Sequence, residues 1–135
     1  MGVPDLLRRV PLFAGFDDEV LERLSAPFSE VEFPVDHVLI EPRTPGAGLF
    51  VICDGSVVAE ARGRERELGA GDVVGEISLV EDDGLRRARV VSKTPLRCLA
   101  LDRAGFERLA EAEPQVADAI RALARERLGE REPSE

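Results

Sequence analysis

Several residue types that carry chemistry are scarce or missing in this chain of 135 residues. It has one histidine, two cysteines, and no tryptophan or tyrosine. The single histidine, His37, cannot supply the ligand set of a cupin-type metal enzyme, and a serine-histidine triad would depend on it alone. No serine or cysteine lies in a nucleophile-elbow pattern, and there is no P-loop. We therefore expect no enzymatic activity and no metal site or cofactor, with His37 a partly exposed strand residue.

Long hydrophobic runs are also absent. No segment approaches the roughly 18 apolar residues that span a bilayer, and the first ten residues, MGVPDLLRRV, lack the apolar core of a signal peptide. The 27 acidic and 18 basic residues give a formal net charge of −9, which disfavours sequence-independent binding to DNA or to an anionic membrane. We expect a soluble, cytoplasmic protein with neither nucleic acid nor membrane as a partner.

The two cysteines are far apart in the sequence, and each lies inside an apolar run. Cys53 ends LFVIC and Cys98 is the centre of LRCLA. This context favours two buried thiols over a disulfide or a metal pair.

The length and the 44% hydrophobic content suit one globular domain with its own core. We assign it residues 1–128. The charged tail, residues 129–135, contains Pro133 and is expected to be disordered.

The hydrophobic pattern predicts helices at both ends and short strands between them. The expected helices are 4–9, 17–24 with Asp17 as N-cap, 103–112 with Asp102 as N-cap, and 114 to about 128. Apolar runs separated by proline, glycine and aspartate predict antiparallel strands, with a tight hairpin at Arg62-Gly63. These strands are 31–33, 37–40, 49–53, 56–61, 65–68, 73–74, 88–92 and 96–101. The fold class is therefore α+β, mainly β, a roll or barrel flanked by helices.

The last expected helix carries an apolar stripe. Its members are Val116, Ala119, Ile120, Leu123 and Ala124. The stripe can dock the helix on the roll or pair it with a second subunit in a homodimer, and amphipathicity does not choose between these alternatives.

The most informative segment is 71–91, GDVVGEISLVEDDGLRRARVV. Gly75 follows a short apolar strand and lets the backbone approach a ligand closely. The apolar residues 77–80 suit one helical turn, whose free amides would point at an anion. The carboxylate of Glu76 would accept a hydrogen bond from a neutral hydroxyl of the same ligand, while the planar guanidinium of Arg86 suits phosphate oxygens. The spacing indicates a site for a small phosphate ester.

Part of this segment resembles the phosphate-binding cassette of cyclic nucleotide-binding domains. It consists of Gly75-Glu76-Ile77-Ser78-Leu79, a short acidic spacer, and Arg86-x-Ala88-x-Val90. The segments 10–13, 55–57 and 68–72 agree with that family as well, so the resemblance covers roughly residues 8–128. Within that family, the chain resembles a catabolite-activator (Crp/Fnr-like) sensor domain. It implies a jelly-roll-like β-roll, a double-stranded β-helix, that holds cAMP or cGMP in a regulatory, signalling role.

The resemblance also implies roles for residues. Glu76 would bind the ribose 2′-hydroxyl, Arg86 the cyclic phosphate, and the C-terminal helix would lid the site or report on it, with Leu123 and Arg127 facing the purine. The expected ligand-binding residues are Gly75, Glu76, Ile77, Ser78, Arg86, Arg87, Ala88, Leu123 and Arg127.

Some positions depart from the family pattern. At the position of Arg87 the family usually has a small hydroxylated residue. A threonine there favours cGMP, and this chain has none, so cAMP is the expected ligand. Arg89 also replaces a small residue, and Leu85 and Val74 replace the usual proline and aromatic residue. In a strand, residues 86, 88 and 90 share one face, so Arg87 and Arg89 can point outward toward the acidic residues 81–83, a solvated loop.

An alternative follows from these departures. Arg87 and Arg89, and the absence of the helix-turn-helix that many such sensors carry, fit a degenerate roll that binds no nucleotide and acts as an interaction or dimerisation module. In either case the effector protein is unknown.

Overall fold

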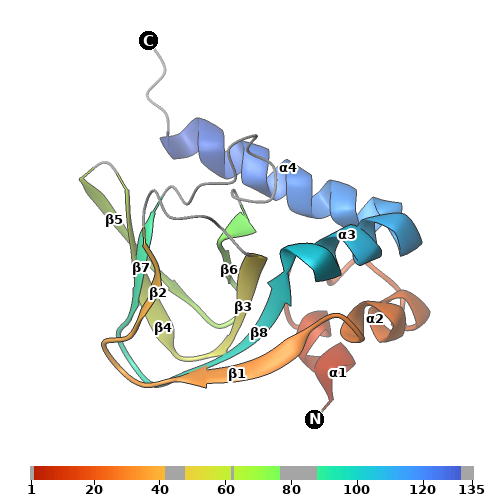
Figure 1. Cartoon of the computed structure of the whole chain (residues 1–135), viewed down its shortest axis with the longest axis horizontal. Coiled ribbons are helices and arrows are strands. Elements are labelled where there is room, and N and C mark those ends of the chain that lie inside the picture. The colour runs from red at the N-terminus through yellow and green to blue at the C-terminus, as the bar shows by residue number, and fades with distance from the viewer. Residues whose placement is uncertain (1, 42–47, 62, 77–87, 132–135) are drawn as a thin grey trace.

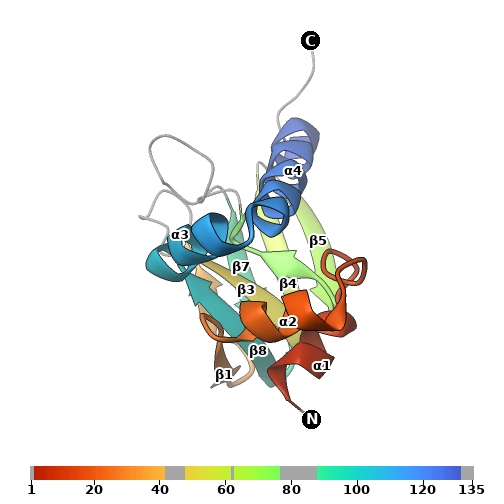
Figure 2. The same ribbon diagram turned by 90° about the vertical axis from the view of Figure 1, so that its right-hand side faces the viewer.

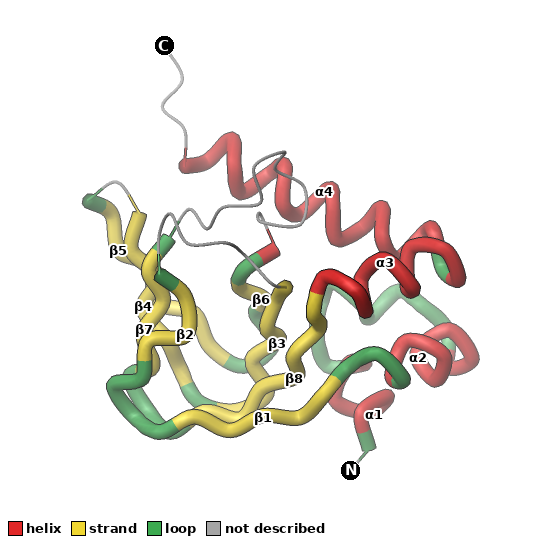
Figure 3. The backbone as a smooth tube through the Cα atoms, in the orientation of Figure 1, coloured by secondary structure: helices red, strands yellow, loops and turns green. Residues whose placement is uncertain are grey.

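The computed structural model describes residues 2–41, 48–61, 63–76 and 88–131, and these ranges contain eight strands and four helices. The strands form a roll, and the helices lie along one side of it and across one end (Figures 1 and 3). The predicted fold class, a mainly β jelly-roll-like roll flanked by N-terminal and C-terminal helices, is confirmed.

The strands form two four-stranded sheets in which every pairing is antiparallel. The first sheet has the order β1-β8-β3-β6 and the second β2-β7-β4-β5. Apart from β4 and β5, neighbours in a sheet are not consecutive in the sequence, as in a roll whose chain passes repeatedly between its two sheets. The bounds are β1 Ser29–Phe33, β2 Val38–Ile40, β3 Gly48–Asp54, β4 Ser56–Ala61, β5 Arg64–Gly69, β6 Val73–Val74, β7 Arg89–Ser92 and β8 Leu96–Asp102.

The helices are α1 Val3–Arg8, α2 Asp18–Ser25, α3 Arg103–Ala112 and α4 Pro114–Arg131. Both predicted N-caps are confirmed. The carboxylate of Asp17 accepts a hydrogen bond from the Val20 amide at 3.0 Å, and that of Asp102 accepts one from the Gly105 amide at 2.6 Å. Each satisfies an amide that a helix leaves without an internal partner, which fixes where α2 and α3 begin.

Element boundaries differ from the prediction by a few residues. Strand β1 begins at Ser29 rather than residue 31, β2 begins one residue after His37, and β7 begins one after Ala88. The largest difference concerns the tail, because α4 continues to Arg131, past the predicted end near residue 128. Glutamate and arginine are good helix formers, and one glycine costs a helix only about 1 kcal/mol. Residues 132–135 lie outside the described ranges.

The predicted hairpin between 56–61 and 65–68 is present. Ala61 pairs with Arg64, so β4 and β5 are joined by two residues, of which Gly63 has φ 77°. Such a left-handed conformation is what a two-residue hairpin loop requires and what glycine adopts without strain. Arg62 lies outside the described ranges.

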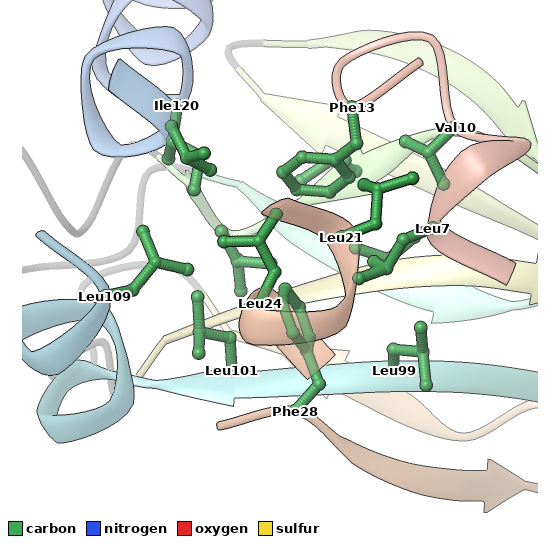
Figure 4. Close-up of a cluster of buried hydrophobic side chains, with 14 of the residues drawn as sticks. Leu7, Val10, Phe13, Leu21, Leu24, Phe28, Leu99, Leu101, Leu109 and Ile120 are labelled. Carbon is green, nitrogen blue, oxygen red and sulfur yellow. The ribbon is translucent and has the colours of Figure 1, made fainter. Parts of the chain in front are cut away.

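One hydrophobic core lies between the helices and the outer face of the first sheet. Figure 4 shows Leu7 from α1, Leu21 and Leu24 from α2, Leu109 from α3 and Ile120 from α4 meeting Leu99 and Leu101 of β8. Figure 2 shows the helices gathered over this side of the strands. This core fixes the position of α4 relative to the strands.

A second core fills the space between the two sheets. Its members come from strands of both sheets, or directly precede β7 in the case of Ala88. They are Ile40, Ile52, Val57, Ala59, Leu68, Val74, Ala88, Val90, Leu96 and Cys98. Neighbouring residues such as Val51 and Ile52 contribute to different cores because alternate side chains of a strand point to opposite faces.

The apolar stripe of α4 docks on its own chain. Val116, Ile120 and Ala124 are buried, and Ala119 and Leu123 are half-buried. This observation supports the first of the two alternatives given for the stripe, docking on the roll. Pairing with a second subunit stays a prediction.

Candidate functional site

The candidate site begins where β6 ends, in the first sheet. Val73 and Val74 pair with β3, and both are buried. Gly75 follows with φ 89°, in the left-handed region that favours glycine. The chain therefore turns sharply after β6, and the turn places Glu76 inside the molecule, where its side chain is 1% exposed.

The carboxylate of Glu76 has a cationic partner from the far end of the chain. Nη1 of Arg127 in α4 lies 2.8 Å from Oε1 of Glu76. The same nitrogen donates a hydrogen bond to the backbone carbonyl of Val73. Figure 1 shows α4 crossing the end of the roll at which β6 terminates. Arg127 thus ties the last helix both to the end of β6 and to the predicted ribose-binding carboxylate.

This ion pair is buried on both sides, since the Arg127 side chain is only 9% exposed. Removing two charges from water is costly, and their attraction repays that cost only with good geometry and further hydrogen bonds. The Val73 carbonyl supplies such a bond. Among the described side chains, no buried nitrogen or oxygen lacks a partner.

The strand that follows the cassette shows the predicted alternation. Ala88 and Val90 are buried, while Arg89 is exposed and forms an ion pair of 3.3 Å with Glu41. Arg89 therefore points away from the interior, as expected, although its described partner is Glu41 rather than the acidic residues 81–83. Ala88 lies with Val74 in the core between the sheets.

Five of the nine predicted ligand-binding residues are described. The structure joins Glu76 directly to Arg127, and Gly75 immediately precedes that pair. Leu123 lies one helical turn before Arg127 and is half-buried against the core that holds the helices. The remaining four predicted residues lie outside the described ranges, as do Leu85 and the helical turn predicted for 77–80. These four are Ile77, Ser78, Arg86 and Arg87.

Besides the pairing of Glu76 with Arg127, sequence reasoning missed two further contacts of the C-terminal helices. One is the carbonyl of Val73, which as a backbone group leaves no signal in the sequence. The other is the ion pair of Arg23 in α2 with Glu113, at the junction of α3 and α4. The Arg23 guanidinium holds the pKa of the Glu113 carboxyl below its usual value. Arginines and glutamates are so frequent in this chain that pairing across 90 residues cannot be read from the sequence.

Neither cysteine belongs to the site. Both thiols are free. Cys98 is buried, as predicted, whereas Cys53 is only half-buried. Burial raises the pKa of the Cys98 thiol to about 12 and raises that of Cys53 as well. The described residues include no group of three or more histidine, cysteine, aspartate or glutamate side chains placed to hold a metal ion.

The family profile described as "cyclic nucleotide-binding domain" matches residues 30–113 of the chain. This chain belongs to that family. The match runs from β1 to the junction of α3 and α4, and it includes the turn at Gly75 and Glu76. The predicted family resemblance is therefore confirmed.

Relatives in the cyclic nucleotide-binding family occur in several settings. A cyclic nucleotide-gated potassium channel of Rhizobium etli is 31% identical over 124 residues, which are 92% of this chain and 35% of the channel. The solved catabolite activator protein of Thermus thermophilus is 31% identical, with a TM-score of 0.77 over 89% of this chain and 59% of that one.

A third relative is the regulatory subunit of a cAMP-independent protein kinase A from Trypanosoma brucei. It is 28% identical and has a TM-score of 0.77 over 90% of this chain and 45% of that chain. This chain thus spans about a third of the channel's length and about half of each solved relative's. In the described ranges, none of the helices is both long enough and apolar enough to cross a membrane.

Proposed function

We propose that this chain is a regulatory module that binds a cyclic nucleotide, cAMP in preference to cGMP, and signals by rearranging its C-terminal helix. The observation that carries the proposal is the position of Glu76. The sequence resemblance assigns its carboxylate to the ribose, and in the structure that carboxylate contacts α4, the element expected to move. One carboxylate therefore connects the proposed ligand site with the proposed output.

The proposed ligand contacts divide by chemistry. Glu76 accepts a hydrogen bond from the ribose 2′-hydroxyl, and Arg86 binds the cyclic phosphate through two parallel hydrogen bonds. Backbone amides of Ile77, Ser78 and Ala88 complete the phosphate site, with Gly75 allowing the close approach of the backbone. Leu123 and Arg127 are the residues proposed to face the purine.

The Arg127 ion pair is consistent with anion binding. An isolated carboxylate beside a phosphate would repel it, whereas a Glu76 compensated by Arg127 leaves the charge of Arg86 available to the ligand. The name of one relative, a cyclic nucleotide-gated potassium channel, supports the ligand class. We propose neither a catalytic step nor a metal for this chain, which we treat as one domain over residues 1–128.

A second candidate function is a roll that binds no nucleotide and serves as a protein-interaction module. The observation favouring it is that Glu76 already has a partner, Arg127, inside the folded chain. The relative whose name states cAMP independence shows that the fold also occurs in such a regulator.

Thermal unfolding with and without excess nucleotide distinguishes the two candidates. A ligand at 100 times its dissociation constant stabilises a fold by roughly 2.7 kcal/mol, which raises Tm by several degrees. We expect this shift with cAMP, a smaller one with cGMP, and none for Arg86→Ala. Arg64→Ala, which removes an exposed arginine from β5, is the matched control and should keep the shift. No shift with either nucleotide would favour the second candidate.

A further inference from the structure

A pocket that takes no part in the proposed nucleotide site lies between the end of α2 and the end of α3. Its volume is about 270 Å³. Leu24 and Leu109 are buried at its base, and both belong to the core beneath the helices, as Figure 4 shows. Ala26, Pro27 and Ala112 complete the apolar lining and are exposed or half-buried. Their small side chains leave an apolar space that none of the described residues fills.

The acidic residue that lines this pocket, Glu113, is already compensated. Its side chain is 8% exposed, and its carboxylate accepts hydrogen bonds from Nε of Arg23 and, at 3.1 Å, from Nε2 of Gln115. The Arg23 side chain is itself 55% exposed, and within the described part of the chain its contact uses only Nε. The N–H groups on the two Nη atoms of Arg23 therefore remain available as donors at the pocket.

Arg108 of α3 adds a second guanidinium to the lining. It is exposed, and no carboxylate of the residues that the structure describes forms an ion pair with it. With two arginines and one glutamate, the lining has a net positive charge, although the chain as a whole has a formal net charge of −9. Guanidinium groups bind carboxylates through pairs of parallel hydrogen bonds. The charge of the pocket is therefore complementary to an acidic group.

The size of the pocket suits one large side chain of another protein. Pockets that enclose whole small molecules typically have volumes of about 300–1,000 Å³, and this one is smaller. In protein interfaces, the residues that contribute most to affinity are aromatic or large apolar side chains inserted into such pockets, and arginine is enriched beside them. Arg23 and Arg108 supply that charged surround here.

We propose that this α2–α3 pocket is a docking site for an acidic segment of a partner protein. The segment inserts one large apolar side chain above Leu24 and Leu109 and places a neighbouring carboxylate on Arg108 and Arg23. A basic segment would bring its cations against two arginines, so the sign of the charge selects the partner. The inference goes beyond the proposed function and does not depend on nucleotide binding.

NMR titration of the intact chain, with its leucine methyl groups labelled, tests the proposal with capped tripeptides. Acetyl-Asp-Phe-Asp-amide should shift the methyl resonances of Leu24 and Leu109 to saturation, and should leave Leu68, in the core between the sheets, unmoved. Acetyl-Lys-Phe-Lys-amide reverses the charge, and acetyl-Asp-Ala-Asp-amide removes the ring. Each should bind at least about tenfold more weakly, because each loses either the ion pairs or the apolar contact.

Two variants with matched controls sharpen the test. Arg108→Met keeps the apolar stem and removes the charge, and should reduce the preference for the acidic over the basic peptide by about tenfold. Arg125→Met removes the same charge from an exposed position of α4 and should behave as the wild type. Ala112→Leu fills the pocket from an exposed position and should abolish the shifts, whereas Ala104→Leu, exposed in the first turn of α3 and outside the lining, should preserve them.

Three outcomes would overturn the docking proposal. They are equal affinity for the acidic and basic peptides, shifts that survive Ala112→Leu, and no shift with any peptide. Tighter binding of free 4-phenylbutyrate than of the acidic peptide would overturn it as well, because the pocket would then hold a small acid rather than a protein segment. Cyclic nucleotide is left out of every titration, so failure here leaves the nucleotide-binding function standing, and failure of that function leaves this test intact.

Discussion

The guanidinium of Arg127 lies 2.8 Å from the carboxylate of Glu76, and both side chains are buried. Arg8 lies at the same distance, 2.8 Å, from Asp18, but that pair is exposed to solvent. Both pairs join an arginine to a carboxylate at the same distance, and they differ in burial, although Arg8 also pairs with Asp5 at 2.8 Å. They therefore form a natural comparison for how much a charge pair contributes to this fold.

We predict that Arg127→Met lowers the free energy of unfolding by about 3–5 kcal/mol, because it leaves the Glu76 carboxylate buried and uncompensated. Arg8→Met should change it little, since water and salt screen an exposed pair. The double variant Glu76→Gln, Arg127→Met should lose less than Arg127→Met alone. Urea unfolding at pH 7 measures all three. Equal losses for Arg127→Met and Arg8→Met would show that the buried pair does not stabilise the fold.

Gly48 at the start of β3 is predicted to tolerate no side chain. A Cβ there would lie 1.9 Å from the carbonyl oxygen of Leu101 and 2.6 Å from Cα of Asp102, and backbone of a paired strand cannot yield. Gly48→Ala should therefore cost about 3 kcal/mol or more. At Gly15 a Cβ would meet no atom within 4 Å, so Gly15→Ala is the control and should stay within about 0.5 kcal/mol of wild type. A stable Gly48→Ala protein would mean that β3 and β8 are farther apart than described here.

Glu113 gives the fold a pH dependence of known sign. Its hydrogen bond with Arg23 lowers the pKa of its carboxyl below the ordinary 4.5. The contribution of the charged form is therefore complete above pH 4.5 and is lost as the pH falls through the lowered value. The difference in Tm between wild type and Glu113→Gln should be full at pH 7 and vanish in stronger acid.

Glu111→Gln is the matched control for that series, because it removes the same charge from an exposed position of α3. Its Tm should follow that of the wild type at every pH. If the difference in Tm between wild type and Glu113→Gln persists unchanged in strong acid, the stabilisation does not come from the charge of the Glu113 carboxylate.

The two thiols should differ in reactivity. Burial raises the pKa of the Cys98 thiol to about 12, so almost none of it is thiolate at pH 8, and the thiolate is the reactive form. Cys53 is half-buried and should react slowly with Ellman's reagent in the folded protein, with Cys98 reacting only after unfolding in guanidinium. The Cys53→Ser variant should then show no reaction in the folded state. A rapid reaction of folded Cys53→Ser would mean that Cys98 is reachable from solvent.

Much of the fold could be predicted from local signals. Three predicted features that depend on neighbours in sequence are present. They are the N-caps Asp17 and Asp102, the hairpin at Gly63, and the alternation of buried and exposed side chains across Ala88, Arg89 and Val90. Gly75, which the sequence singled out for close approach of the backbone to a ligand, has the left-handed conformation that glycine adopts without strain.

The pairing of distant residues could not be predicted in the same way. The partner of Glu76 lies 51 residues away, and the sequence alone gave Arg127 only a place on the purine side through the resemblance. The end of α4 was also predicted too early. The helix continues through residues 129–131, because the helix propensity of Glu130 and Arg131 outweighs the tendency of Gly129 to end a helix. Both misses arise from interactions between elements or from small sums of propensity, which local patterns do not resolve.

The most direct test of the central claim, that Glu76 and Arg86 form a nucleotide site, is calorimetric titration of the wild-type chain with cAMP and with 2′-deoxy-cAMP. The account predicts one cAMP bound per chain and at least about tenfold weaker binding of the deoxy nucleotide, because a hydrogen bond to a carboxylate contributes roughly 1.5–3 kcal/mol. Equal affinity for both nucleotides would contradict the role of Glu76. No saturable heat with either would contradict the claim as a whole.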